Sequence, residues 1–411
     1  MNLISQDLRD KFLRVSYKDI LHIFKFLTAL PVALIYRHFR RNIWLFSEYG
    51  DEARDNAYWL FRYVRTEHPD EDAVYAINKN SPDFKKVESL GKTVSYGSLM
   101  HWIYYLAARV NISSQKGGKP NAAVCYLLEV YGVLKNTRVL LQHGIILNDT
   151  KYLYYRKTKI SLFICGAKPE YNFVKAKFGY PENSVVCTGM CRYDALMGAN
   201  KESKTILVVP TWRKWIAHDR HFARNGGAKE FQHTDYYKKW NDLLNSRQLD
   251  NILKSNGLHL IFCPHRNMEA FVGDFTSCSP CIRILRWKDL DVHNAIFSSA
   301  LLVTDYSSIS VDFAYTGKCL LYYQFDADMF HKNHLSSGYF DYARDGFGHV
   351  CHAEKQLIDK IDFYAKNGFC REKIYNKRAS RFFAYIDDGN CERSYRAVKR
   401  MLDGGTERAF R

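Results

Sequence analysis

The stretch Leu301-Leu-Val-Thr-Asp-Tyr-Ser-Ser308 decides the fold class of this chain. Its first four residues are typical of a buried strand. The polar residues that follow can begin a helix, because a serine hydroxyl caps exposed backbone N–H groups. A buried strand followed at once by a helix is the repeating unit of a parallel sheet that helices cover on both faces.

The same alternation runs through the whole chain. In the first half we expect helices over 52–68 and 98–108, and strands at 42–47, 73–77, 93–96, 110–113, 138–142 and 162–165. In the second half we expect a helix over 379–402, and strands at 205–209, 258–262, 301–304 and 319–323. We therefore predict an α/β protein of two Rossmann-like, doubly wound domains that face a central cleft. The predicted domains are residues 1–200 and 201–411, joined by the polar stretch 198–204, with a terminal helix that could pack back on the first domain.

The charge balance narrows the class of partner. Lys and Arg number 60 against 43 Asp and Glu, and the net charge of +17 favours nucleic acid, phosphorylated metabolites or an anionic membrane. No nucleic-acid-binding module is recognisable, so we expect no nucleic-acid partner. The sequence also lacks the P-loop, dinucleotide-binding and zincin motifs, which argues against those three enzyme classes.

The eleven cysteines indicate a reducing, cytosolic compartment, because they follow no repeating frame in a chain too large to depend on disulfides. Residues 1–14 carry no apolar core of the kind that a secretion signal needs. Cys278 and Cys281 have the spacing of metal ligands, but a zinc site would need a second pair, and we favour a structural role. We predict no metal site and no obligatory cofactor, and the sequence leaves a requirement for divalent ions open.

The most apolar early segment, residues 20–36, bears on membrane contact. It has seventeen residues, contains Pro31 and is followed by Arg37, Arg40 and Arg41. A membrane span needs about 20 apolar residues, so we expect no span. Two interpretations have equal weight: a helix that lies in the interface of an anionic membrane, or a core helix with a basic end.

Ligands of doubly wound sheets bind beyond the carboxyl ends of the strands, so residues at those ends form the candidate site. Gln142, His143 and Gly144 lie at the end of the strand 138–142, and the glycine lets a ligand approach the backbone closely. His265 follows the strand 258–262. A lone histidine is more often structural, but two at strand ends favour a functional pair, one imidazole from each domain.

Hydroxyl and carboxyl groups follow the strand 301–304. The hydroxyls of Ser307 and Ser308, beside the N–H groups of a helix start, suit a diphosphate, although an ordinary helix cap explains them as well. Asp312 lies four residues after Ser308 on the same helix face, where its carboxylate could accept hydrogen bonds from ligand hydroxyls.

A basic segment follows the strand 205–209 and its successors Pro210 and Thr211. It contains Arg213, Lys214, His218, Arg220, His221 and Arg224. Two interpretations have equal weight: a loop that closes on phosphate groups, or a solvated insertion.

These strand-end motifs, in this order, resemble the CDP-glycerol:poly(glycerophosphate) glycerophosphotransferases, which include teichoic acid and capsule polymerases. The resemblance covers roughly residues 43–350 and begins with Asp55-Asn-Ala-Tyr58 and Ile112-Ser-Ser114. It is strongest at Thr304-Asp-Tyr-Ser-Ser-Ile-Ser-Val-Asp-Phe-Ala314, then at Gly338-Tyr-Phe-Asp-Tyr342. It implies a GT-B fold and action at the cytoplasmic face of the cell membrane.

The resemblance also implies roles for individual residues. His143 matches the family's proposed general base on the acceptor hydroxyl, and His265 matches a second essential histidine near the donor phosphates. Arg192, in Gly189-Met-Cys-Arg-Tyr-Asp194, is similar to the arginine of the family's Gly-x-x-Arg-x-Asp pattern. We predict donor contacts at Gln142, Gly144, Arg192, Pro210, Thr211, Arg213, Ser307, Ser308 and Asp312.

Two positions depart from the family's pattern. The usual Trp-His-Gly-Thr-Pro reads here Gln142-His-Gly-Ile-Ile146, and Cys263 stands where many members carry a basic residue. Both departures bear on the acceptor and the polyol more than on the reaction class.

We therefore expect a cytoplasmic transferase, peripheral on the inner face of the membrane. It would move a polyol phosphate, glycerol phosphate first, from a CDP-polyol to a hydroxyl of a lipid-linked or polymeric glycan, and release CMP. The alternative is a GT-B glycosyltransferase, and a preference for UDP- or GDP-sugars over CDP-polyols would favour it.

Overall fold

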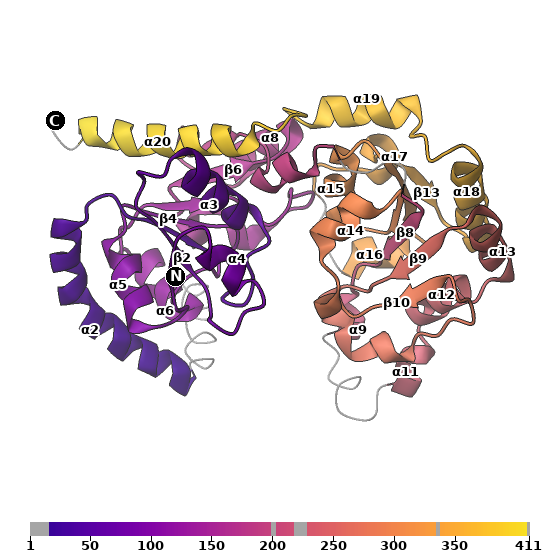
Figure 1. The fold of residues 1–411 in the computed structure, drawn as a ribbon, viewed down its shortest axis with the longest axis horizontal. Coiled ribbons are helices and arrows are strands. Elements are labelled where there is room, and N and C mark those ends of the chain that lie inside the picture. The colour runs from indigo at the N-terminus through magenta and orange to yellow at the C-terminus, as the bar shows by residue number, and fades with distance from the viewer. Residues whose placement is uncertain (1–15, 199–202, 218–227, 334–337, 409–411) are drawn as a thin grey trace. The chain divides into compact units, whose positions relative to one another are not determined.

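The computed structural model describes residues 16–198, 203–217, 228–333 and 338–408, which divide into two compact units (Figure 1). The N-terminal unit runs from the first described residue to His143 and takes in Lys151–Asp194 and the chain from Asp387 onward. The C-terminal unit comprises Gly144–Thr150 and Ala195–Ile386. The chain leaves the N-terminal unit for its long second segment after residue 194, rather than at the predicted residue 200. The last helix belongs to the N-terminal unit. Part of the predicted linker, 199–202, lies outside the described residues.

The N-terminal unit contains a sheet of seven parallel strands. Their order is β3 (Lys92–Val94), β2 (Ala73–Ala76), β1 (Trp44–Ser47), β4 (Val110–Ser113), β5 (Arg138–Leu140), β6 (Leu162–Cys165) and β7 (Val185–Cys187). Every residue of β1, β2, β4, β5 and β6 is buried, as expected of strands covered on both faces. The strand order reverses between β1 and β4, which is where doubly wound sheets bind their ligands.

Helices cover both faces of this sheet. Successive side chains of β1 point to opposite faces, so Trp44 and Phe46 lie in one apolar cluster and Leu45 lies in the other. On the first face lie α3 (Asn56–Glu67) and α20 (Asn390–Arg408), which contact each other and run along one side of the unit in Figure 1. On the second face lie α2 (Tyr17–Phe39) and α5 (Leu99–Ala107). The shorter helices of this unit are α4 (Phe84–Glu88), α6 (Ala122–Val130), η1 (Lys151–Leu153), α7 (Tyr155–Thr158), α8 (Lys168–Lys177) and η2 (Cys191–Leu196).

The C-terminal unit repeats the architecture with six parallel strands. Their order is β10 (Ile282–Ile284), β9 (His259–Phe262), β8 (Thr205–Val209), β11 (Leu301–Thr304), β12 (Cys319–Tyr323) and β13 (His349–Cys351), with the reversal between β8 and β11. Its helices are α9 (Lys214–Ala217), α11 (Ala228–Gln232), α12 (Asp235–Leu244), α13 (Arg247–Asn256), η3 (Arg266–Asp274), η4 (Trp287–Asp289), α14 (Val292–Ser298), α15 (Ile309–Tyr315), α16 (Ala327–Asn333), α17 (Tyr342–Asp345), α18 (Glu354–Lys366) and α19 (Lys373–Phe382).

The structure contains three strands that were not predicted and divides one predicted helix, and several other predicted bounds differ by a few residues. The strands β7, β10 and β13 were not predicted; each has three residues and lies at the edge of its sheet, where the fully apolar pattern weakens. The helix predicted over 379–402 is two helices, α19 in the C-terminal unit and α20 in the N-terminal unit.

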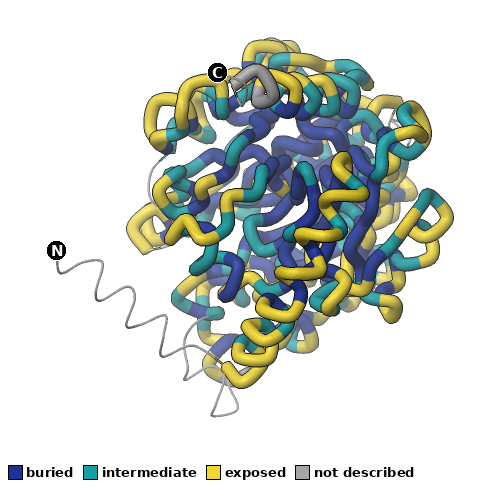
Figure 2. The backbone as a smooth tube through the Cα atoms, turned by 90° about the vertical axis from the view of Figure 1, so that its left-hand side faces the viewer, coloured by how far each residue is buried: buried dark blue, intermediate teal, exposed yellow. Residues whose placement is uncertain are grey.

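The early apolar segment forms α2, a helix of 23 residues that packs on α5 by one side. Phe26, Ala29 and Ala33 are buried, and the Phe26 and Trp102 rings lie 5.7 Å apart. The other side exposes large apolar residues. Figure 2, which colours the backbone by burial, turns this side of the unit toward the viewer. The helix extends beyond 20–36 at both ends, and by length and composition α2 could cross a membrane, so the expectation of no span stays a prediction.

Candidate active site

The turn after β5 presents the predicted base. His143 is exposed, and the residue before it, Gln142, has a φ of 63°. This left-handed conformation costs about 1–2 kcal/mol for a residue with a β-carbon. The Gln142 amide donates from Nε2 to the carbonyl oxygen of Ile164 at 2.6 Å and to Oε1 of Glu170 at 3.1 Å. Strained backbone conformations that neighbouring groups hold in place are common at functional sites. This turn is therefore a candidate functional site.

Two side chains from other elements hold the carbonyl groups of this turn. Asn56, the first residue of α3, donates from Nδ2 to the carbonyl oxygen of Gln142 at 2.7 Å. Arg192, in η2, donates from Nη1 to the carbonyl oxygen of His143 at 2.8 Å and to Oδ1 of Asp55 at 2.6 Å. The Arg192 side chain is 10% exposed. Its predicted contact with the donor remains a prediction.

A buried carboxyl group lies at the reversal point of this sheet. Glu48 directly follows β1 and accepts the backbone N–H groups of Arg54, Asp55 and Tyr58, at 2.9, 3.1 and 2.9 Å, where α3 begins. Burial, with the charge of Asp55 as a smaller cause, raises the pKa of Glu48 to about 8. Across the reversal, Ser114 follows β4, and its Oγ accepts the N–H of Ala57 at 2.7 Å.

Sequence reasoning gave no role to Glu48, Asp55, Asn56 or Ser114. The signal was present for two of them: Glu48 and Ser114 directly follow predicted strands, the position that singled out His143 and His265. Asp55 and Asn56 lie at the start of α3, where Asp55 caps the helix by accepting the N–H of Asn56 at 2.7 Å. That Asn56 contacts the His143 turn, and that Asp55 contacts the Arg192 that holds it, is visible only in the folded chain.

Three residues of the stretch Gly189-Met-Cys-Arg-Tyr-Asp194 have separate structural roles. Gly189 has a φ of 87°, and a β-carbon there would lie 1.7 Å from Oδ1 of Asn390, so only glycine fits. Arg192 holds the His143 turn, as described above. Asp194 accepts the backbone N–H groups of Asn390 and Cys391 and so caps α20.

In the C-terminal unit, the reversal point is organised by Asp305. This fully buried carboxylate follows β11 and accepts the N–H groups of Thr211 at 2.8 Å and of Tyr306 at 2.7 Å. Burial raises its pKa, and the nearby Arg213 guanidinium opposes that rise. Thr211, a predicted donor contact, is thereby fixed directly after Pro210 at the end of β8.

Arg213 was predicted to contact the donor, and the structure places its guanidinium in the core. The side chain is 0% exposed, with nitrogens 2.9 Å from Asp305 and 2.7 Å from Asp326. The rings of Phe330 and Tyr306 lie 4.9 and 5.2 Å from its central carbon. Of the rest of the predicted basic segment, Lys214 begins α9, and His218, Arg220, His221 and Arg224 lie outside the described residues.

His265 is half-buried at the carboxyl end of β9, directly before η3. Its Nδ1 accepts the N–H of Asn267 at 3.2 Å, and its ring lies 6.3 Å from that of Trp212 and 5.5 Å from that of Trp287. A neutral imidazole that accepts through Nδ1 carries its proton on Nε2. The ring is therefore set to donate a hydrogen bond from Nε2.

The predicted diphosphate-binding site lies at the start of α15, a helix of seven residues. Ser307 accepts the N–H of Ile309 on its Oγ at 3.3 Å, and Ser308 is exposed at the N-cap without a side-chain cap bond. Asp312 is buried, 7% exposed. The donor contacts predicted for these residues remain predictions.

The two predicted catalytic histidines belong to different units, His143 to the first and His265 to the second. Each lies at the carboxyl end of its own sheet, beside polar groups that hold the turn. That the two rings face one another remains a prediction.

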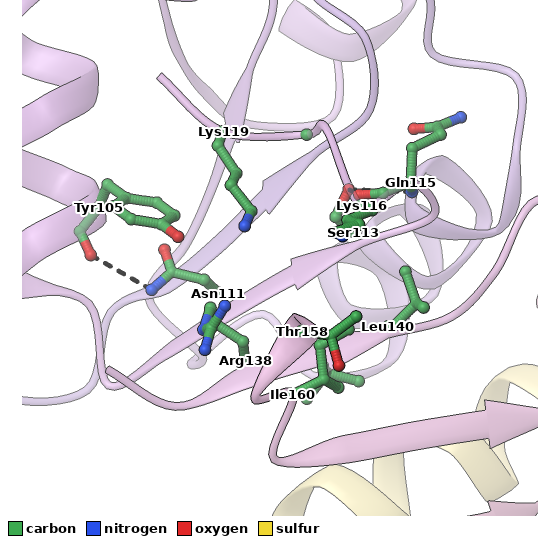
Figure 3. Close-up of a pocket in the computed structure, with 12 residues that line it drawn as sticks. Tyr105, Asn111, Ser113, Gln115, Lys116, Lys119, Arg138, Leu140, Thr158 and Ile160 are labelled. Carbon is green, nitrogen blue, oxygen red and sulfur yellow. Dashed lines mark hydrogen bonds between the residues drawn. The ribbon is translucent and has the colours of Figure 1, made fainter. Parts of the chain in front are cut away.

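One cavity in the N-terminal unit is lined by residues of β4 and β5, among them Ser113 and Leu140 (Figure 3). Its volume is about 30 Å³, and its lining includes Tyr105, Asn111, Lys119 and Arg138. Lys119 and Arg138 form ion pairs with the buried carboxylate of Glu129. The volume suits about two water molecules and is far below the roughly 300–1,000 Å³ of ligand pockets, so this cavity is not a substrate site.

Metal-ligating side chains do not cluster among the residues that the structure describes. No group of three or more His, Cys, Asp or Glu side chains is placed to hold an ion there. The cysteines are free thiols, with Cys278 exposed and Cys281 half-buried.

The comparison with protein families decides the relationship. A profile of the CDP-glycerol:poly(glycerophosphate) glycerophosphotransferases matches residues 30–400. The chain belongs to this family. The minor teichoic acid biosynthesis protein GgaB of Bacillus subtilis (strain 168) is 31% identical over 374 residues, which are 87% of this chain and 40% of GgaB. The teichoic acid poly(glycerol phosphate) polymerase of Bacillus spizizenii (strain ATCC 23059 / NRRL B-14472 / W23) is 27% identical over 232 residues, 54% of this chain and 52% of that protein. The chain thus spans about half the length of these relatives, or less.

Solved structures share the fold of this chain, including one of a teichoic acid polymerase. The wall teichoic acid polymerase TagF aligns with a TM-score of 0.63 at 14% identity, covering 98% of this chain and 99% of that one. MnaA from S. aureus, in a structure with UDP, aligns with a TM-score of 0.52 at 13% identity, covering 88% and 96%. The predicted fold class, two Rossmann-like domains of the GT-B type, is confirmed.

Proposed function

We propose that this chain transfers a polyol phosphate, with glycerol phosphate as the first candidate, from its CDP ester to an acceptor hydroxyl and releases CMP. The acceptor is a teichoic acid, capsule or related cell-surface polymer, carried on a lipid or already partly built. The observation that carries the proposal is family membership across residues 30–400. The names of GgaB and of the poly(glycerol phosphate) polymerases support the teichoic acid assignment.

In this reaction the acceptor oxygen attacks the β-phosphorus of the donor. The bond from that phosphorus to the oxygen it shares with the α-phosphorus breaks, and that oxygen leaves with CMP. His143 takes the proton of the attacking hydroxyl, a step typically worth about 10²–10⁴-fold. Its exposed ring, on a turn held by hydrogen bonds to its backbone, supports this role.

The C-terminal unit binds the donor in this proposal. His265 donates from Nε2 to the diphosphate, and the groups at the ends of β8 and β11, including Thr211, Ser307 and Ser308, add further hydrogen bonds. Donors already in place stabilise charge that grows on the leaving phosphate, which is often the largest single catalytic effect. The fixed orientation of the His265 ring supports this assignment.

We also propose that α2 lies on the inner face of an anionic membrane, which brings the enzyme to a lipid-linked acceptor. Phe24, Leu34 and Ile35 are 62, 65 and 63% exposed, a large apolar surface for one helix. Lys18 and Arg37, also exposed, lie near its two ends and would meet lipid phosphates. The double variant F24D/I35D should lose co-sedimentation with vesicles that contain phosphatidylglycerol while keeping activity on a soluble acceptor. Equal sedimentation of variant and wild type would contradict the membrane assignment.

The activity is tested by incubating the protein with CDP-glycerol or CDP-ribitol and an oligomeric acceptor while CMP is measured, with and without EDTA. We expect CMP release with at least one CDP-polyol, and loss of that release in H143A. Wild-type inactivity with both donors would refute the proposal, and H143A as active as wild type would refute the assigned base. Turnover of UDP- or GDP-sugars alone would establish the glycosyltransferase alternative.

A further inference from the structure

We propose that Asp55 and Arg192 form a clamp that positions His143, and that the Nη1 group of Arg192 serves this turn rather than the donor diphosphate. The proposal rests on the proposed function, in which His143 is the general base. It makes Asp55 and Arg192 positioning residues, which act through His143 and touch no reacting atom.

The hydrogen bonds of one guanidinium nitrogen support the clamp. A guanidinium Nη carries two hydrogens, and Nη1 of Arg192 donates to two acceptors: Oδ1 of Asp55 at 2.6 Å and the carbonyl oxygen of His143 at 2.8 Å. A contact from Nη1 to a phosphate would break one of these two bonds. The Asp55–Arg192 ion pair is also largely shielded, with side chains 16 and 10% exposed.

The backbone that carries His143 needs such a restraint. Gln142 holds a φ of 63°, which a chain without these contacts would leave for a lower-energy conformation. Asn56 links both parts of the clamp, because it donates to the Gln142 carbonyl at 2.7 Å and accepts the backbone N–H of Arg192 at 3.0 Å. The two consecutive carbonyl groups of the turn are thus each held by a different side chain.

Asp55 orients the guanidinium from the start of α3. One of its oxygens caps the helix and receives Arg192, and the other accepts Nε2 of Gln115 at 3.3 Å. The N-terminus of a helix is a favourable place for a carboxylate, which suits Asp55 as the partner of Arg192. A misplacement of about 1 Å at a reacting group can cost about 100-fold in rate, which is the loss that the clamp prevents.

Steady-state kinetics of R192Q and D55N test the clamp. We expect both variants to lower kcat for CMP release by roughly 10- to 100-fold while the KM for the CDP-polyol stays within about threefold. D55N is the mild variant, because it keeps the shape and one acceptor oxygen. The matched control is K119M, which breaks a similarly buried ion pair with Glu129 in the same unit and should keep wild-type kcat. A tenfold or larger rise in donor KM in R192Q, with kcat unchanged, would overturn the proposal in favour of a donor contact.

A second measurement does not depend on activity. Diethyl pyrocarbonate modifies exposed imidazoles, and peptide mass spectrometry gives the rate at His143, with the exposed His259 of the other unit as the internal reference. Release of the turn should change the His143 rate at least threefold in R192Q and D55N and leave it unchanged in K119M. Wild-type rates in both variants would refute the clamp. If the wild-type protein releases no CMP, the proposed function fails, and this measurement still decides the clamp.

Discussion

The carboxylate of Asp194 accepts the backbone N–H of Cys391 at 2.8 Å, so a residue of η2 caps a helix that lies almost 200 residues later in the chain. The same short helix carries Arg192, which holds the His143 turn. The start of α20 and the candidate base are therefore linked through six residues, Cys191–Leu196.

We expect Asp194→Ala to lower both stability and the rate of CMP release. Loss of an N-cap costs about 0.5–2 kcal/mol, and η2 would lose the contact that fixes it. Thermal unfolding and the CMP assay measure the two effects. Asp403→Ala is the control, because this exposed carboxylate pairs with Arg109 near the other end of α20 and should matter little. Indistinguishable behaviour of the two variants would contradict the link.

Arg213→Ala should strongly destabilise the C-terminal unit. The substitution leaves Asp305 and Asp326 without the guanidinium that neutralises them, and breaking such a buried pair typically costs about 3–5 kcal/mol. Urea unfolding followed by tryptophan fluorescence measures the loss, and the surface variant Lys355→Ala serves as reference. A normally stable Arg213→Ala protein with weakened CDP-polyol binding would instead support the donor contact predicted from sequence.

The protein should become less stable as the pH rises, because Glu48 loses its proton. Its pKa is about 8 in the folded chain against 4.5 for an ordinary glutamate, because burial disfavours the charged form. Over this pH range the folded state holds a proton on Glu48 that the unfolded state releases. The resulting gain in the free energy of unfolding is complete below about pH 4.5 and is lost as the pH rises through 8, a change of at most about 5 kcal/mol. Urea unfolding between pH 5 and 8 should show a decline that is smaller in Glu48→Gln. An equal slope in both proteins would show that Glu48 is already ionised at pH 5.

His265 should tolerate glutamine better than asparagine. A glutamine amide can place an N–H near the position of Nε2, whereas the shorter asparagine amide lies near Nδ1, which here accepts from Asn267. Loss of a preorganised hydrogen-bond donor commonly lowers the rate about 10²–10³-fold. We therefore expect the asparagine variant to release CMP about 100-fold more slowly than wild type, and the glutamine variant to be at least tenfold faster than the asparagine variant. A more active Asn variant would reverse the assignment of the two ring nitrogens.

Much of the fold could be predicted because its central strands are fully buried. A strand covered on both faces reads as a continuous apolar run, and β4, β6, β8, β11 and β12 appear in the sequence with their observed bounds. The edge strands β7, β10 and β13 are only three residues long and partly exposed, so no such run marks them.

The candidate site was predictable where it depends on strand ends and not where it depends on distant contacts. His143 and His265 follow strands, and the structure places each at the carboxyl end of its own sheet. Arg213 also follows a strand, but the carboxylates of Asp305 and Asp326 draw its side chain into the core. The reach of Arg192 to Asp55 spans 137 positions, a relationship that no local pattern contains.

The return of α20 to the first unit has a consequence for biosynthesis. A chain emerging from the ribosome presents residues 195–386 before α20 exists, so the first unit cannot complete its packing when its own strands have been made. Trp44 and Phe46 share an apolar cluster with Val398 and Leu402, and that surface stays uncovered until α20 has been made. The portion encoded later should thus reach its native state first, and the nascent N-terminal portion is the one that chaperones would need to shield.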